Sequence, residues 1–243
     1  MTDSAFTKEQ FDAIYPAGIE RHYWNHARNH IIGTLLAQYG LNKGSILEIG
    51  CGKGIVVDFL RVRGIDCAGV EQGDAEVLPG CRDHVFTNTD AFELPAATRQ
   101  GVETILLLDV LEHMPDPDAF IGDIREKFEN ARHLLVTVPA RQELWSNYDV
   151  YNGHFRRYSL SDALHLSVSQ IAVRDARYFF HLLYPVFWIL TRMVRKRNTV
   201  IKAPAGVFIL LHRAISWVLR MDFHIMPHHW RGTSIIAVFS FRR

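Results

Sequence analysis

The fold is decided by the stretch Ser45-Ile-Leu-Glu-Ile-Gly-Cys-Gly-Lys-Gly54. Its apolar first half predicts a short buried strand, and its second half carries a glycine at every second position: Gly50, Gly52 and Gly54. Glycine has no Cβ, so the backbone N–H groups of such a turn can approach a ligand closely. A dinucleotide-binding fingerprint would need a third glycine where Ile55 stands. The pattern instead places an acid, Glu48, two residues before the first glycine.

Acidic residues end three further predicted strands, at Glu71, Asp90 and Asp109. Strands are expected at 65–70, 84–90, 102–109, 133–138, 171–180 and 232–243, and helices at 55–63, 118–130 and 160–168. This alternation predicts an α/β fold with a doubly wound, seven-stranded, mainly parallel sheet. Ligands bind such sheets outside the carboxyl ends of the strands, where Gly50 and the three acids are expected to lie together.

The segment after the 102–109 strand reads Asp109-Val-Leu-Glu-His113-Met-Pro-Asp-Pro117. This segment and the Glu48 glycine motif resemble the class I S-adenosylmethionine-dependent methyltransferases, in particular their small-molecule subgroup. The resemblance covers about residues 20–180 and the last strand. It implies a Rossmann-like fold, S-adenosylmethionine as cofactor and S-adenosylhomocysteine as product.

The resemblance also assigns residues to the cofactor. Glu71 lies 17 residues after Gly54, a distance that suits an acid accepting both ribose hydroxyls, although a solvated turn acid is the alternative. Asp90 would accept from the adenine amino group. The implied cofactor-binding set is Tyr23, Arg28, Glu48, Gly50, Cys51, Gly52, Gly54, Glu71, Gln72, Asp90, Ala91, Leu108, Asp109 and His113.

Residues 1–40 are expected to form helices, at 8–14 and 19–39, with Gly40 as a C-terminal stop. Tyr23, Trp24 and Arg28 fall on nearby turns of the second helix. Ordinary partial burial would explain them. The resemblance offers a second explanation, an N-terminal lid over the methionine end of the cofactor in which Arg28 pairs with the cofactor carboxylate.

The loop 140–159 contains Gly153-His154-Phe-Arg-Arg157-Tyr158. Similar loops in this family shape the acceptor pocket, which implies substrate contacts from Trp145, Tyr148, His154, Arg157 and Tyr158. For an oxygen acceptor the base needs a pKa near neutrality, which favours histidine. His154 and His113 are the candidates, with Tyr158 as a positioning donor. The alternative for both histidines is that they only orient their own loops.

Composition limits the partners and the location. The net charge is +1, which is not the basic signature of a nucleic-acid-binding protein. The three cysteines form no C-x-x-C pair, and the first residues lack the apolar core of a signal peptide. We therefore expect one intracellular, cytoplasmic methyltransferase domain over 1–243 and no contact with nucleic acid.

An insertion at 181–230 separates the last two predicted strands and is far longer than a usual connection. The segment from Tyr178 to Arg231 holds eight Lys/Arg and one acid, so its net charge is +7 against −6 for the remainder. It predicts two apolar helical segments, the second pairing an apolar face (Phe208, Leu211, Ile215, Val218) with a polar stripe (Arg213, Ser216, Arg220). Arg195-Lys196-Arg197 lies between the segments.

Two interpretations of this insertion are open. The first is a helical subdomain packed on the sheet edge. The second is an interfacial amphipathic element that contacts a membrane and admits a lipid-like or anionic acceptor. No run of apolar residues is long enough to span a bilayer.

Missing motifs restrict the chemistry further. Asp109-Val-Leu-Glu112 replaces the Asn/Asp-Pro-Pro-Tyr/Phe of enzymes that methylate amino groups of nucleic-acid bases and glutamine. His224, His228 and His229 lack the spacing of a metal site, so no metal is predicted. The sequence favours metal-independent methyl transfer to a small or lipid-like acceptor, at oxygen before carbon or nitrogen. The alternatives are a non-catalytic cofactor-binding protein and an NAD-dependent oxidoreductase.

Overall fold

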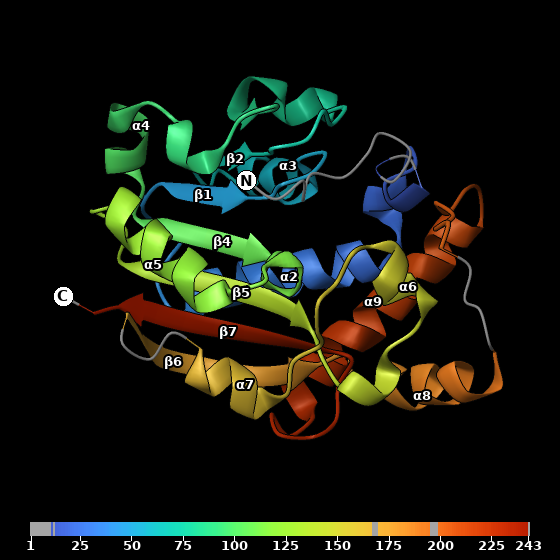
Figure 1. Cartoon of the computed structure of the whole chain (residues 1–243). Helices are drawn as coiled ribbons and strands as arrows, with labels where there is room; N and C mark the ends of the chain where they lie inside the picture. The colour runs from blue at the N-terminus through green and yellow to red at the C-terminus, as the bar shows by residue number, and fades with distance from the viewer. Residues whose placement is uncertain (1–10, 12, 167–169, 195–198, 243) are drawn as a thin grey trace.

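The computed structural model describes residues 11, 13–166, 170–194 and 199–242. A seven-stranded sheet runs through it in the order β3-β2-β1-β4-β5-β7-β6 (Figure 1). The strands are β1 Ile46–Ile49, β2 Cys67–Val70, β3 Val85–Phe86, β4 Thr104–Leu108, β5 His133–Pro139, β6 Ile171–Phe179 and β7 Ser234–Phe241. The first five are parallel, and β7 runs antiparallel to both β5 and β6. The predicted doubly wound, mainly parallel sheet is confirmed.

The central strands β1, β4, β5 and β7 are buried on both faces because helices cover the sheet from both sides (Figure 1). One face packs against α5 (Pro117–Lys127) and α7 (Leu160–His165). The other packs against α2 (Tyr23–Gln38), α3 (Ile55–Arg61) and α9 (Phe208–Ile225). Shorter elements fill the connections: α4 Ala96–Gly101, α6 Asn147–Tyr151, η1 Ile19–Arg21, η2 Pro79–His84, η3 Ala91–Glu93, η4 Leu111–His113 and η5 Gln142–Leu144.

Topology places the site. β1 lies between β2 and β4, so the chain leaves β1 toward one side of the sheet and β4 toward the other. Connections that diverge in this way open a crevice at the carboxyl ends of β1 and β4. The glycine loop and Asp109 both begin at that crevice.

Most predicted boundaries shift by a few residues in the structure, and two of these shifts have a local cause. The third strand covers only Val85 and Phe86 rather than 84–90, because Asn88 has a left-handed φ of 52° and Asp90 turns to cap η3. Helix α5 begins one residue earlier than predicted, with the Asp116 carboxylate accepting from the Ala119 N–H. The predicted helix at 160–168 is α7, which begins at Leu160 after a capping box between Ser159 and Asp162.

The insertion forms α8 (Leu183–Met193) and α9, at the end of the molecule where the strands finish (Figure 1). Helix α9 packs on α2 through Leu219 and Phe223. The predicted apolar and polar faces of α9 are wrong: Ser216 is fully buried, whereas Phe208 is 62% exposed. The reason is that α2 presents His26, whose Nδ1 lies 2.8 Å from Ser216 Oγ.

Two further predictions concern the basic run of the insertion and the absence of a membrane span. Arg195, Lys196 and Arg197, and most of the predicted 8–14 helix, lie outside the described residues. Among the residues that the structure describes, no helix is both long enough and apolar enough to cross a bilayer.

Candidate active site

The glycine loop leaves β1 through positive φ angles at Gly50 (74°), Gly52 (55°) and Gly54 (77°). A Cβ at Gly50 would also come within 2.9 Å of Val110 Cγ2, in the loop after β4. Only glycine therefore allows the two loops to meet at the crevice. Cys51 is buried beneath this loop, and its burial raises the pKa of its thiol.

Glu71 is fixed by backbone donors. Its two carboxylate oxygens accept from Gly52 N–H at 2.8 Å and from Gly73 N–H at 2.9 Å. These bonds tie the ends of β1 and β2 together and leave the remaining lone pairs of the carboxylate for a ligand. Asp90 is held in a similar way, because its carboxylate accepts a hydrogen bond from the Phe92 N–H.

Glu48 lies in β1 and is 3% exposed. Burial raises the pKa of this carboxyl to about 8, although the nearby Arg28 guanidinium opposes the shift. Oε2 of Glu48 has no hydrogen-bond partner among the described residues. A buried polar atom of this kind marks a place where a ligand group or water completes the structure.

Arg28 reaches from α2 to the end of β4, where its guanidinium pairs with the Asp109 carboxylate. Asp109 has a φ of 59° and also accepts from Thr137 Oγ1 at 3.1 Å. The Nε–H of Arg28 is buried without a partner in the described chain. The pair thus connects the N-terminal helix to the sheet and retains a donor for a carboxylate ligand.

The N-terminal segment covers this crevice. Phe11 is 3% exposed, and a Cβ at Gly73 would lie 2.7 Å from its ring. Tyr15 approaches Gly52 in the same way, and burial raises the pKa of its hydroxyl. Neither residue is among the predicted cofactor contacts, because both precede α2, on which the predicted lid residues lie.

A cavity of about 350 Å³ lies between α2, the loop after β4 and the loop that follows β5. Its wall combines charged and aromatic groups, which suits an aromatic or otherwise apolar acceptor with a polar handle. Residues from several separate segments line it, including Tyr23, Arg28, Asp109, Glu112, His113, Tyr148, Asn152, His154, Arg157 and Phe187.

His154 is held by Asp149 on one wall of this cavity. Its Nδ1 lies 3.0 Å from Asp149 Oδ1, which also accepts from Arg157 Nε at 2.7 Å. Burial alone would raise the pKa of Asp149, but the bond from His154 and the charge of Arg157 lower it to about 2. An ionised carboxylate on Nδ1 fixes the imidazole and leaves Nε2 as its second nitrogen.

The His154 loop is attached to the loop after β4 by three hydrogen bonds. Phe155 N–H donates to Glu112 O at 2.7 Å, and the Tyr158 hydroxyl donates to Leu111 O at 3.0 Å. Arg156 donates to the Pro115 carbonyl at 2.6 Å. The two predicted histidines therefore belong to one connected unit.

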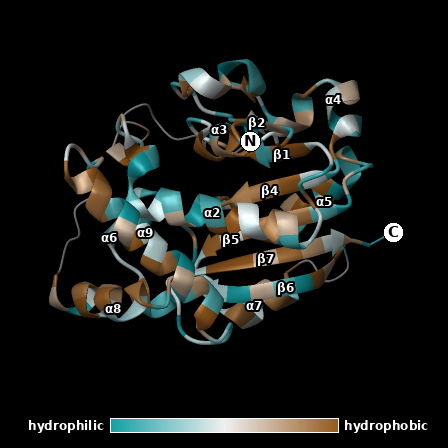
Figure 2. Ribbon diagram, turned by 180° about the vertical axis from the view of Figure 1, so that it is seen from behind, coloured by the Kyte–Doolittle hydropathy of each residue, from teal (hydrophilic) through white to brown (hydrophobic). Residues whose placement is uncertain are grey.

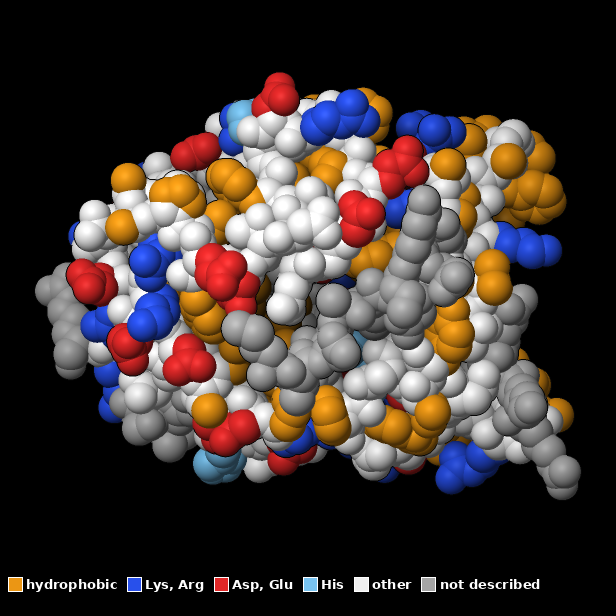
Figure 3. All heavy atoms as spheres, turned by 45° about the horizontal axis from the view of Figure 1, so that its top comes forward, with side chains coloured by type: hydrophobic (Ala, Val, Ile, Leu, Met, Phe, Trp, Pro, Cys, Tyr) orange, Lys and Arg blue, Asp and Glu red, His pale blue; other side chains and the backbone are white. Residues whose placement is uncertain are grey.

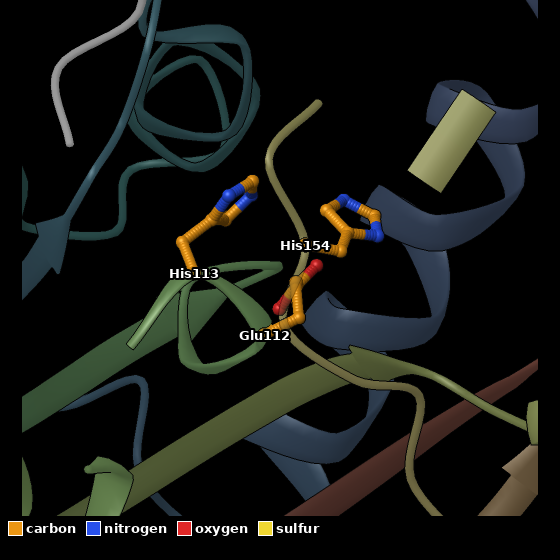
Figure 4. Close-up of side chains that lie close together, drawn as sticks. All are labelled: Glu112, His113 and His154. Atoms are coloured by element: carbon orange, nitrogen blue, oxygen red, sulfur yellow. The ribbon is translucent and has the colours of Figure 1, made fainter. Parts of the chain in front are cut away.

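Glu112, His113 and His154 converge at the centre of this unit (Figure 4). One donor atom from each lies within 4.8 Å of the others, and the two imidazole rings meet edge to face at 4.8 Å. Burial, together with the Asp109 charge, raises the pKa of Glu112 well above its usual value. Burial and the proximity of His154 lower the pKa of His113 to about 4.

Two chemical states suit this cluster. A protonated Glu112 beside two neutral imidazoles is uncharged, which fits its burial. An ionised Glu112 with the two histidines would instead form a two-histidine, one-carboxylate set suited to a divalent transition metal. Sequence reasoning missed the cluster because His154 lies some forty residues beyond Glu112, whereas the histidines weighed and rejected as metal ligands, His224, His228 and His229, lie close together in the sequence.

A protein-family model described as a methyltransferase domain matches residues 22–166 of this chain. The chain belongs to the methyltransferase domain family. The resemblance to class I S-adenosylmethionine-dependent methyltransferases is thereby confirmed, and the oxidoreductase alternative is set aside.

Curated relatives of this methyltransferase match it over one segment. A ubiquinone biosynthesis O-methyltransferase of Hahella chejuensis is 30% identical over 84 residues, which cover 32% of this chain and 35% of the relative. One from Acinetobacter baumannii (strain AYE) is 27% identical over 107 residues, 41% of this chain and 45% of the relative. The matched segment thus spans less than half the length of either relative.

Solved structures share the fold over nearly the whole methyltransferase. A protein of Pyrococcus horikoshii OT3 superimposes with a TM-score of 0.55 at 11% identity, covering 98% of this chain and 100% of that one. The magnesium protoporphyrin IX methyltransferase of Synechocystis PCC 6803, with S-adenosylhomocysteine bound, has a TM-score of 0.52 at 12% identity, covering 96% and 92%.

The predicted site residues of the methyltransferase separate into three groups. Tyr23, Arg28, Asp109, His113, Tyr148, His154 and Arg157 line the cavity. The glycine loop, Glu71 and Asp90 surround the crevice beside it, with Ala91 and Leu108 buried and Gln72 exposed. Trp145 and Tyr158 are outside the described lining of the cavity, and the Tyr158 hydroxyl is committed to the Leu111 carbonyl.

Proposed function

We propose that the protein transfers the methyl group of S-adenosylmethionine to a hydroxyl of a small, apolar or lipid-like acceptor. The observation that carries this proposal is the Asp149–His154 pair, whose histidine lines the cavity together with Arg28. His154 Nε2 takes the hydroxyl proton while Asp149 stabilises the imidazolium that forms. Arg157 keeps Asp149 ionised for this role.

The chain's own residues fit the cofactor. The glycine loop takes positive φ angles and has no Cβ at three positions, which suits a close approach of backbone and ligand. Glu71 is held by backbone donors and is placed to accept ribose hydroxyls. The unpartnered Arg28 Nε–H suits a carboxylate. When bound, the cofactor supplies a methyl group already activated by its sulfonium, so the protein contributes proximity, alignment and a base.

Relatives support the acceptor class. The curated matches are named as ubiquinone biosynthesis O-methyltransferases, which act on oxygen in the synthesis of a lipid-soluble molecule. Phe187 and Ile201 give the cavity an apolar wall from the insertion, consistent with such an acceptor. A cytoplasmic location beside a membrane follows from this proposal and remains a prediction. Turnover without a metal likewise remains a prediction.

Calorimetry with S-adenosylhomocysteine tests the cofactor, with NAD as a parallel titration. We expect micromolar binding of S-adenosylhomocysteine, about −8 kcal/mol, and none of NAD. Absence of binding by the folded protein would remove the proposal.

Methyl transfer tests the base. Transfer of labelled methyl groups to a panel of hydroxylated, alkyl-substituted aromatic acceptors should fall by about 10²-fold or more in kcat for His154→Gln. Its affinity for S-adenosylhomocysteine should not change. His165→Gln, an exposed histidine on α7, is the matched control. Binding without transfer to any acceptor would favour the non-catalytic alternative, and an active His154→Gln would assign proton removal elsewhere.

A further inference from the structure

The insertion leaves large apolar side chains in solvent. Met193 on α8 is 78% exposed, and Leu210 and Ile225 on α9 are 64% and 68% exposed. Figure 2 shows hydrophobic residues along α8, which buries little beyond Tyr184. Single exposed apolar residues are normal, but a set spread over two neighbouring helices marks an interaction surface. Its other exposed members are Val186, Trp188, Ile189, Leu190, Phe208, Leu211, Trp217 and Val218.

Basic residues accompany these apolar ones. Figure 3 shows hydrophobic side chains interspersed with Lys and Arg at the right-hand end of the molecule, where α8 and α9 lie in Figure 1. Arg192, Lys202 and Arg213 are exposed on the insertion. Its single acid, Asp222, is buried against His181. A second copy of this surface would bring like charge against it, whereas an anionic bilayer complements it.

A cavity of about 510 Å³ lies beside the first turn of α8 and the residues that follow α9. Arg141, His181 and Arg231 line it together with the apolar Leu182 and Trp230. His181 is 6% exposed, and its Nε2 has no partner among the described residues, while Nδ1 lies 3.2 Å from Asp222 Oδ2. A phosphate oxygen would provide the acceptor that a protonated Nε2–H needs, beside two guanidinium groups.

We propose that this end of the molecule docks on an anionic phospholipid bilayer, with α8 and α9 at the headgroup boundary and a lipid phosphate in the Arg141–His181–Arg231 cavity. Docking does not depend on the proposed function, but it supplies a route for its acceptor. The start of α8 contacts both cavities. Leu182 and Pro185 line the Arg141–His181–Arg231 cavity, and Phe187 lines the cavity of the candidate active site. An acceptor dissolved in the bilayer would therefore reach His154 along α8.

Flotation of the full chain with vesicles tests this proposal. We expect binding to phosphatidylcholine vesicles that contain 30% phosphatidylglycerol, little binding to phosphatidylcholine alone, and weaker binding at 300 mM than at 50 mM salt. Arg231→Ala should weaken binding about fivefold, and Arg141→Ala/Arg231→Ala further. Phe208→Ser, at a position 62% exposed, should also weaken it.

Controls separate the possible failures. Lys127→Ala changes an exposed lysine near the amino end of β5 and should leave vesicle binding unchanged. Every variant should keep wild-type affinity for S-adenosylhomocysteine, so that a failure here is distinct from a failure of the proposed function. No vesicle binding, equal binding to neutral vesicles, or a stable dimer in ultracentrifugation without vesicle binding would each overturn the proposal.

Discussion

The two sides of the crevice are built differently. On the cofactor side, the acids are held by backbone N–H groups of nearby loops, as Glu71 is by Gly52 and Gly73. On the acceptor side, side chains hold one another, as His154 and Arg157 do through the carboxylate of Asp149. A ligand common to a whole family suits the first design, because backbone amides change little with sequence. The second design can change its ligand by changing a few side chains.

The largest effect is expected where the acceptor side depends on one buried carboxylate. Asp149→Ala should lower kcat by about 10²–10⁴-fold, because His154 loses its orienting partner. It should also destabilise the fold by about 3–5 kcal/mol, since Arg157 is left buried and unpaired. Urea unfolding and methyl-transfer rates measure the two effects.

Affinity for S-adenosylhomocysteine is the control for this variant, and it should stay within about threefold of wild type if the two sides are independent. Asp162→Ala, a capping acid on α7, offers a matched loss of a capping carboxylate outside the cavity. Unchanged kcat in folded Asp149→Ala would contradict the role given to the pair.

This contrast also explains what the sequence could predict. The cofactor side follows from local patterns: an apolar strand, then a turn residue of defined chemistry, as at Gly50 and Glu71. Alternation of strands and helices then fixes the sheet, and the resemblance identifies the cofactor. Such information lies within a few residues of each site, so it survives without knowledge of the tertiary fold.

The acceptor side could be predicted only in part. His154 and Arg157 were found through a loop resemblance, but their dependence on Asp149 arises from a packing arrangement that no spacing shows. Tyr15 was missed for the same reason. On α9, periodicity gave the wrong buried face, because a hydrogen bond from α2 places Ser216 inside. Tertiary partners determined these outcomes.

The cofactor side is tested next by Glu71→Ala. Loss of the carboxylate removes ligand hydrogen bonds and the connection between Gly52 and Gly73, so the affinity for S-adenosylhomocysteine should fall by about 10–100-fold. Vesicle binding should be unchanged. Glu76→Ala, an exposed acid a few residues along, is the matched control. Glu71 is buried, so the solvated turn acid of the sequence-based alternative is excluded. An affinity equal to that of wild type would show that Glu71 only holds the turn and does not contact the cofactor.

A smaller, pH-dependent effect is expected at Glu48. Its pKa is about 8 in the folded protein and ordinary when unfolded, so between those values only the unfolded state loses the proton. Folding is therefore penalised increasingly as the pH rises toward 8, by up to about 1.4 kcal/mol per pKa unit. Glu48→Gln removes this penalty, so its melting temperature should gain on wild type by several degrees from pH 5 to pH 8. Glu103→Gln, an exposed control, should show no such trend, and a pH-independent gap would refute the shift.

The smallest effect is expected from metal removal. Burial raises the pKa of Glu112 and lowers the pKa of His113, so it disfavours a charge on either group, and the buried cluster does not require a cation. Dialysis against EDTA should then change kcat less than twofold, and elemental analysis of the purified protein should find no stoichiometric metal. Loss of activity on chelation that zinc, manganese or iron restores would mean that Glu112 is ionised against a bound ion. In that case the ion, held by Glu112, His113 and His154, would activate the acceptor hydroxyl, and the acceptor side would differ from the cofactor side in its chemistry as well as in its construction.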